Sequence, residues 1–164
     1  MTNIPVLSVV GTSGCGKTTL LEKLIPELKR RGYAVALVKH HPKPGLETDT
    51  PGKDTWRLAR AGADHVALVT PDQVIHRRRW AQPPTLDQVL ADIHHVDLIL
   101  TEGYKQEHRP KIEVNRRAHQ SHLISPREEL VAIASDQPFD LDVPQFDLED
   151  VAGLADWIER QFLA

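Results

Sequence analysis

The sequence of 164 residues has a single cysteine, few aromatic residues and no marked excess of one charge. Cys15 alone cannot form an internal disulfide, so a disulfide scaffold is excluded and a reducing compartment is expected. The 20 basic and 23 acidic residues give a formal charge of −3, which argues against non-specific nucleic-acid binding as the main activity. No apolar run is long enough to span a bilayer, and Met1–Pro5 lack a basic stretch. We therefore expect a soluble, cytoplasmic protein that binds neither nucleic acid nor membrane.

The length is that of one ordinary domain, and 40% hydrophobic with 26% charged residues is typical of a folded chain. Short apolar runs rich in β-branched residues alternate with helical patterns. The predicted strands are 4–10, 33–38, 66–69, 73–80, 96–101, 111–114 and 130–135, and the predicted helices are 17–31, 54–62, 85–93 and a last one that Asp147 caps. This alternation predicts an α/β fold of three layers, in which helices flank a mainly parallel β-sheet.

The strongest motif is a phosphate-binding loop between the first predicted strand and the first predicted helix. Its residues, Gly11-Thr12-Ser13-Gly14-Cys15-Gly16-Lys17-Thr18, match G-x-x-x-x-G-K-[ST] in the strand–loop–helix context that the motif requires. Glycines let the backbone amides turn inward, and these amides and the helix N-terminus bind anions. Lys17 would then contact the β- and γ-phosphates, Thr18 would ligate Mg²⁺ and Thr19 would contact the α-phosphate. Residues 1–164 are therefore predicted to form a single P-loop NTPase-type nucleotide-binding domain.

A nucleotide–Mg²⁺ site also needs carboxylates that face the phosphate loop. Open α/β sheets bind ligands at the carboxyl ends of their strands. Glu102 ends a strand that begins near Asp97, so Glu102 is predicted as the Walker-B-like group, with a role in the strand-end turn as the alternative. Asp49, in the loop after the second strand, is the other predicted Mg²⁺ contact, whereas Asp54 is interpreted as a helix N-cap.

The nucleotide base is not identified by a motif, because the sequence contains no N-K-x-D guanine signature. Asp136 follows the last strand, where a carboxylate could accept hydrogen bonds from guanine N1–H and N2–H₂. A turn role is the alternative for Asp136, and Asn115 is a second candidate for base contact. Residues 39–41 (Lys-His-His) and the arginines at 77–79 stay open between ligand contact and a solvated surface.

Together these motifs resemble the molybdopterin-guanine dinucleotide biosynthesis adapter proteins. The stretches that carry the resemblance include Gly11–Thr19, Asp49–Asp54 (D-T-P-G-K-D), Asp97–Lys105 with T-E-G-Y-K, and Ala134–Pro138 (A-S-D-Q-P), and the matches cover most of the chain. The resemblance implies a homodimeric P-loop protein that binds GTP with Mg²⁺ and hydrolyses it slowly. It also implies that the protein assists a separate molybdenum cofactor guanylyltransferase, which joins GMP to molybdopterin. On this basis Lys17, Asp49 and Glu102 would carry any hydrolysis.

This sequence departs from the family pattern at Pro42, which follows His41, and in the segment from Arg77 to Gln82. Two other function classes use the same loop. A small-molecule kinase needs an acceptor pocket and an arginine-bearing lid, for which Arg77–Arg79 are candidates. A metallochaperone GTPase needs a cysteine- and histidine-rich stretch, against which the single cysteine argues.

Slow hydrolysis is expected because no arginine finger is identifiable in the sequence. The predicted strand at 73–80, with Trp80, is the candidate dimer interface, since a symmetric dimer needs a self-complementary surface. Molybdopterin itself is a candidate ligand of the chain.

Overall fold

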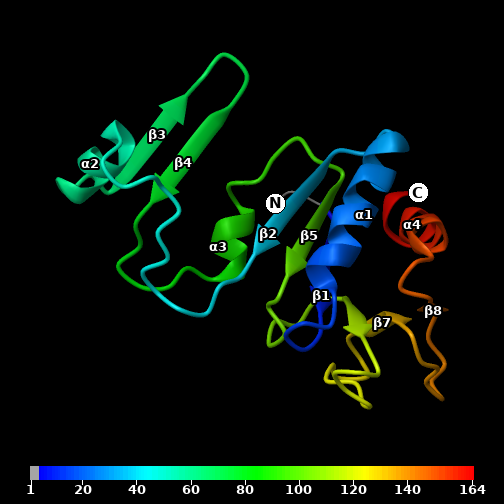
Figure 1. Cartoon of the computed structure of the whole chain (residues 1–164). Coiled ribbons are helices and arrows are strands. Elements are labelled where there is room, and N and C mark those ends of the chain that lie inside the picture. The colour runs from blue at the N-terminus through cyan, green and yellow to red at the C-terminus, as the bar shows by residue number, and fades with distance from the viewer. Residues whose placement is uncertain (1–3) are drawn as a thin grey trace. The chain divides into compact units, whose positions relative to one another are not determined.

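The computed structural model describes residues 4–164, which divide into two compact units. The first unit runs up to His41 and resumes at Ala91, and the second unit is Pro42–Leu90 (Figure 1). Within residues 4–164, no helix is long and apolar enough to cross a membrane. The prediction of a single domain over residues 1–164 stays a prediction.

The first unit is built on a six-stranded sheet with strand order β2-β5-β1-β6-β7-β8, in which each pairing is parallel. Its elements are β1 (Val6–Val10), α1 (Lys17–Arg30), β2 (Val35–Lys39), β5 (Leu98–Glu102), β6 (Lys111–Asn115), β7 (Leu130–Ser135), β8 (Gln145–Phe146) and α4 (Val151–Ile158), which continues as the π-helical η1 (Glu159–Leu163). The predicted α/β class with a mainly parallel sheet is confirmed. Strand β8 was not predicted, because two residues are too short to carry a pattern.

One face of this sheet packs against α1 and α4, which also contact each other. Alternate residues of the central strands supply the sheet side of this core, namely Leu7, Val9, Leu98, Leu100, Ile112, Val114, Ala132 and Ala134. The helices contribute Leu20, Leu21, Leu24, Leu28, Leu154 and Ile158. The period of two in the strands and of about 3.6 in α1 explains why these residues meet on one face.

The ends of three helices test the expected caps. The helix predicted for 17–31 is α1, which contains Pro26 and ends at Arg30, with Arg31 as its C-cap. The two acidic caps were predicted wrongly. Asp54 is the first residue of α2 and Lys53 is its N-cap, whereas Asp150 caps α4 by accepting a hydrogen bond from the Gly153 amide at 3.0 Å. Asp147 accepts from the Glu149 amide instead and so stabilises the turn before the helix.

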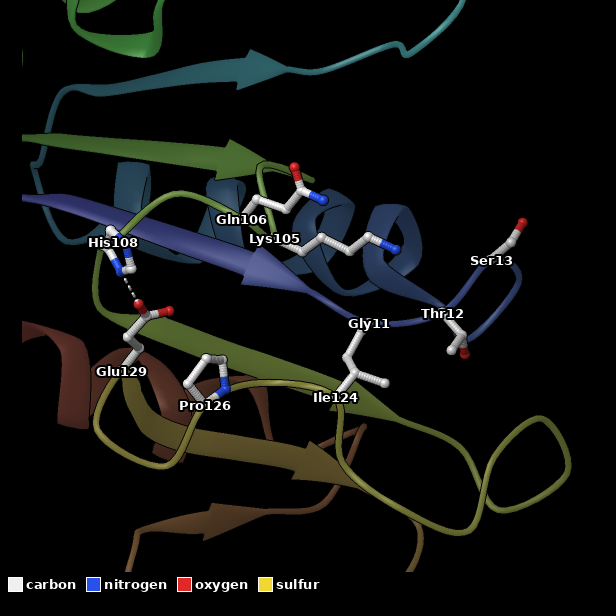
Figure 2. Close-up of a pocket in the computed structure, with 9 residues that line it drawn as sticks. All are labelled: Gly11, Thr12, Ser13, Lys105, Gln106, His108, Ile124, Pro126 and Glu129. Carbon is white, nitrogen blue, oxygen red and sulfur yellow. Dashed lines mark hydrogen bonds and ion pairs between the residues drawn. The ribbon is translucent and has the colours of Figure 1, made fainter.

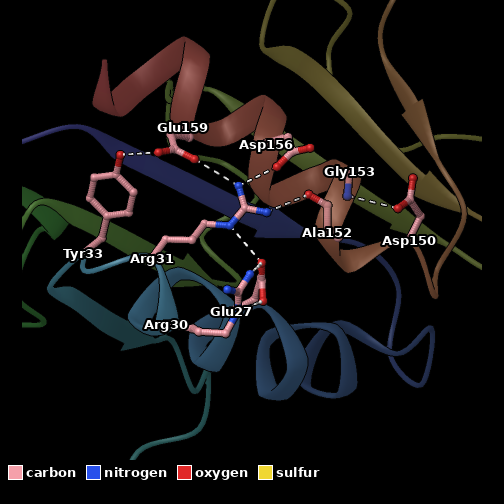
Figure 3. A network of polar contacts seen from close by, with 9 residues as sticks. All are labelled: Glu27, Arg30, Arg31, Tyr33, Asp150, Ala152, Gly153, Asp156 and Glu159. Atoms are coloured by element: carbon pink, nitrogen blue, oxygen red, sulfur yellow. Dashed lines mark hydrogen bonds and ion pairs between the residues drawn. The ribbon is translucent and has the colours of Figure 1, made fainter.

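Charged side chains join the end of α1 to α4 and η1 at the edge of the helical layer (Figure 3). Arg31 contacts Glu27 at 2.8 Å, Asp156 at 2.5 Å and Glu159 at 2.9 Å. The Tyr33 hydroxyl donates to Glu159 at 2.7 Å. This network connects three segments that the apolar core also holds together.

The second unit contains α2 (Asp54–Arg60), α3 (Leu86–Leu90) and an antiparallel hairpin of β3 (His65–Val69) and β4 (Val74–Arg78). The sequence predicted these strands and helices but not that the two strands pair with each other alone. The hairpin leaves four large apolar side chains exposed, namely Leu68, Val69, Val74 and Ile75. The Arg78 guanidinium lies 4.2 Å from the centre of the Trp80 ring, so Trp80 packs beside this hairpin rather than in a core.

Candidate functional site

The glycine-rich loop lies at the carboxyl end of β1, between that strand and α1. Gly11, Gly14 and Gly16 have φ values of 146°, 79° and 102°, a region that L side chains rarely adopt. A Cβ atom on Gly11 would lie 2.3 Å from the Val114 carbonyl oxygen, so only glycine fits there. The loop thus has the backbone freedom and close packing for which its motif selects.

Lys17 and Cys15 point inward from this loop. The Lys17 ammonium donates to the carbonyl oxygens of Gly11 at 3.0 Å and Thr12 at 2.8 Å. Cys15 is fully buried in the core. Gly16 caps α1 without a side-chain hydrogen bond, and the first turn carries no acidic residue. The amides at this helix end are therefore suited to an anion.

Glu102 contacts Thr18 and Lys39, and the strand register explains why. Glu102 pairs with Lys39 of β2 on one side and with Val9 of β1 on the other. Its carboxylate accepts from the Thr18 hydroxyl at 3.1 and 3.2 Å and from the Lys39 ammonium at 3.0 Å. Thr18 and Glu102, both predicted Mg²⁺ contacts, therefore lie together, and Lys39 belongs to the same cluster.

His40 continues this cluster at the edge of the sheet. Its ring lies 4.9 Å from the ring of Tyr104, which has a positive φ of 54°. Gly103 precedes Tyr104, and a Cβ there would lie 3.3 Å from His40 Cβ. The T-E-G-Y-K stretch thus forms a tight turn that packs on the end of β2.

The two predicted base contacts lie on neighbouring strand ends, because Asn115 pairs with Ser135. Asp136 is exposed, and its Oδ1 accepts from the Arg117 amide at 2.7 Å. Asn115 is buried, donates to the His122 carbonyl at 2.9 Å and accepts from Gln137 at 2.6 Å. Asn115 therefore holds two loops in place, and base contact by either residue stays a prediction.

Asp49 belongs to the second unit, where its Oδ1 accepts from the Thr50 amide at 2.8 Å. Asp49 also lines a cavity of about 180 Å³ beside the β3–β4 hairpin, together with Arg77. Its predicted contact with Mg²⁺ stays a prediction.

Two basic residues that sequence reasoning missed lie against the glycine-rich loop. A Cβ on Gly14 would lie 3.2 Å from the His119 ring, and one on Gly16 would lie 3.5 Å from the Arg116 guanidinium. Both residues follow β6, the strand beside β1. The rule that ligands bind at the carboxyl ends of strands, which selected Asn115, applies equally to its neighbour Arg116.

These features fit a nucleoside triphosphate with Mg²⁺. The uncapped N-terminus of α1 and Lys17 are available for phosphate oxygens, and the hydroxyl–carboxylate pair of Thr18 and Glu102 provides the oxygen ligands that Mg²⁺ prefers. Lys39 balances the charge of Glu102 from the neighbouring strand.

The family model described as molybdopterin guanine dinucleotide synthesis protein B matches residues 6–136. The molybdopterin-guanine dinucleotide biosynthesis adapter protein of Escherichia coli K12 is 39% identical over 176 residues, covering 98% of this chain and 97% of its own. That of Haemophilus influenzae Rd is 37% identical over 159 residues, covering 96% and 89%. Among solved structures, the crystal structure of Bacillus subtilis MobB superimposes with a TM-score of 0.78 at 26% identity and covers 97% of this chain and 98% of that chain.

Proposed function

Because this chain belongs to the molybdopterin guanine dinucleotide synthesis protein B family, we propose that it is a GTP-binding accessory protein of molybdenum cofactor biosynthesis. It binds GTP with Mg²⁺ in the cytoplasm and assists a molybdenum cofactor guanylyltransferase, which joins GMP to molybdopterin. The relatives from Escherichia coli and Haemophilus influenzae are both named adapter proteins of molybdopterin-guanine dinucleotide biosynthesis, and this supports an accessory role.

The contact between Thr18 and Glu102 carries the nucleotide-binding part of the proposal. The loop amides and Lys17 bind the β- and γ-phosphates, while Thr18 and Glu102 bind Mg²⁺ directly or through water. When bound, Mg²⁺ neutralises phosphate charge. Asp49 is the second acidic group proposed for the metal, and Asp136 with Asn115 are proposed to recognise guanine.

Hydrolysis by this site is expected to be slow, below one turnover per second. Lys17 and the helix N-terminus stabilise the charge that develops on the phosphates, but an arginine placed at the γ-phosphate accounts for about 10³–10⁵ of the rate in fast GTPases. The sequence identified no such arginine, and Arg116, which the structure places near the loop, lies against Gly16, where α1 begins. The adapter therefore acts by holding GTP, with hydrolysis as a minor activity.

The test is a competition between GTP and ATP for the purified protein, with binding measured by calorimetry. GTP is expected to bind more tightly, and Asp136→Ala is expected to reduce that preference. Lys17→Ala should weaken GTP binding by at least about a hundredfold, because it removes the charge that contacts two phosphates. Lys29→Ala, an exposed lysine in the last turn of α1, is the matched control. A preference for ATP together with phosphate transfer to a small acceptor would favour a kinase instead.

A homodimer through the β3–β4 hairpin is part of the proposal. An isolated two-stranded hairpin is marginally stable in water, yet this one leaves Leu68, Val69, Val74 and Ile75 exposed. Leu68 and Ile75 lie on one face of the hairpin and Val69 and Val74 on the other, so pairing of the first face with the same face of a second copy would bury Leu68 and Ile75. Sedimentation should show a dimer for the wild type and a monomer for Ile75→Asp, and an unchanged dimer in the variant would exclude this interface.

A further inference from the structure

A cavity of about 620 Å³ lies beside the start of the glycine-rich loop, on the opposite face of the sheet from α1 (Figure 2). Gly11–Ser13 line one end, and His108 with Glu129 line the other. Lys105 and Gln106 come from the loop that follows β5, and Ile124 and Pro126 come from the loop that follows β6. The volume lies in the range of small-molecule sites.

The cavity exists because two crossover connections are loops. The segments 103–110 and 116–129, which join β5 to β6 and β6 to β7, contain no helix, so they cover this face incompletely. Each loop is instead fixed by a buried charge of β6. Glu113 accepts from the Ile124 amide at 2.8 Å and the Ser125 amide at 2.9 Å, and Lys111 donates to the Glu107 carbonyl and to Glu129.

The cavity lining has a net positive charge, because its carboxylate, Glu129, is paired with Lys111 and the charge of Lys105 remains. The buried ammonium of Lys111 compensates the carboxylate of Glu129, which His108 also contacts at 2.5 Å. Hydrogen bonds from Lys111 and His108 lower the pKa of Glu129, so its carboxylate is ionised and is already paired with these two side chains. Lys105 has no ion pair or hydrogen bond within residues 4–164, so its charge is available to a ligand.

We propose that this cavity binds a second ligand beside the nucleotide, namely a small phosphomonoester that carries a flat ring. Lys105 and the Thr12 hydroxyl, which line the cavity beside the glycine-rich loop, provide donors for the phosphate. Ile124 and Pro126 provide an apolar wall for the ring. The shared Gly11–Ser13 segment would bring this phosphate next to the nucleotide's own phosphates.

The choice of ligand rests on the proposed function. A guanine dinucleotide joins a GMP unit to a second unit through their phosphates, so the acceptor must itself carry a phosphate. A phosphorylated pterin has this chemistry and a flat ring. The cavity would hold such an acceptor on the adapter while GTP occupies the glycine-rich loop.

The test is a fluorescence titration of the full chain with 6-hydroxymethylpterin phosphate, with and without guanosine 5′-(β,γ-imido)triphosphate and Mg²⁺. The probe is expected to bind in both conditions, and 6-hydroxymethylpterin without the phosphate is expected to bind at least about tenfold more weakly. Lys105→Ala should raise the dissociation constant of the probe about tenfold, as expected for the loss of one charge-assisted hydrogen bond. Ile124→Trp should block the probe by filling the cavity, and Lys29→Ala should change nothing.

Three results would overturn the cavity proposal: no binding of the probe, equal binding to Lys105→Ala and the wild type, or displacement of the probe by the nucleotide. Thermal unfolding of each variant shows that a loss of binding is not a loss of fold. The two proposals fail separately. If GTP binds and the probe does not, only the cavity proposal falls, whereas probe binding without GTP binding contradicts the proposed function alone.

Discussion

The two faces of the central sheet are both covered, but by different chemistry. The face under α1 and α4 is apolar, with Leu7, Val9, Leu100 and Ile112 fully buried. Alternate positions of the same strands face the other way and mix the apolar Val10, Ile99 and Ile133 with buried polar residues, namely Ser8, Thr101, Lys111, Glu113, Asn115 and Ser135. In β6 this alternation reads Lys-Ile-Glu-Val-Asn, with the charged and polar members on the loop-covered face.

The difference follows from what covers each face. A helix satisfies its own backbone groups and therefore needs only apolar contacts from the sheet. A loop cannot do this, so its amides and carbonyls need other partners. Glu113, Asn115 and Lys111 supply such partners to the loops at 103–110 and 116–129. The polar face is thus the scaffold of two loops, and these loops reach the glycine-rich loop and the cavity beside it.

Glu113→Ala should break this scaffold with the largest effect. It leaves the Ile124 and Ser125 amides without their acceptor, and each unpaired buried donor costs about 1–3 kcal/mol. We expect a loss of roughly 2–4 kcal/mol in the free energy of unfolding, measured by urea denaturation. Glu113→Gln keeps one acceptor oxygen and should lose about half as much.

Val114→Ala is the matched control on the helix-covered face of the same strand. It removes two methyl groups from a packed core and should cost about 1–2 kcal/mol without moving either loop. Amide hydrogen exchange separates the two variants, because only the Glu113 variants should speed exchange in 116–129. Equal exchange in that segment would contradict the role given to Glu113.

The sequence was sufficient to predict the elements of the helix-covered face. Short apolar runs rich in β-branched residues identified the strands, and the helical spacing of Leu20, Leu21, Leu24 and Leu28 identified α1, because both patterns are local in the sequence. The pairing of β3 with β4 was not predicted, although Pro71-Asp72 between two short strands is a local signal for a turn. The predicted caps at Asp54 and Asp147 failed because backbone geometry selects the cap. Before α4 it selects Asp150 instead of Asp147, and at α2 it makes Lys53 the cap and Asp54 the first helical residue.

The candidate site was predictable where a motif exists. Gly11–Thr18 were identified by spacing, and Glu102 by its place at a strand end. Arg116 and His119 were missed because they reach the loop from a long connection without regular structure. Lys111 and Glu113 were treated only as members of a strand, although charged residues at alternate positions of a buried strand indicate polar partners on that face.

The charged residues of the helix-covered side lie at the edge of the helical layer, whereas Lys111 and Glu113 of β6 are buried. Hydrogen bonds from Arg30 and Arg31 lower the pKa of Glu27 from 4.5 to about 2, and those from Tyr33 and Arg31 lower the pKa of Glu159. Glu27 and Arg31 are only partly buried, and such pairs contribute less to stability than fully buried ones, since water and salt screen them. A substitution in this network is therefore expected to change the free energy of unfolding less than the substitutions in β6.

Glu27→Gln tests this through the dependence of stability on pH. A carboxyl group whose pKa is lowered by folding stabilises the folded state fully above its unfolded pKa and loses that effect as the pH falls. The wild type should therefore unfold at a higher urea concentration than Glu27→Gln at pH 7, and the gap should narrow between pH 4.5 and pH 2. Glu22→Gln, on an exposed part of α1, should show no such gap. A gap that stays constant down to pH 3 would mean that packing, and not charge, accounts for the role of Glu27.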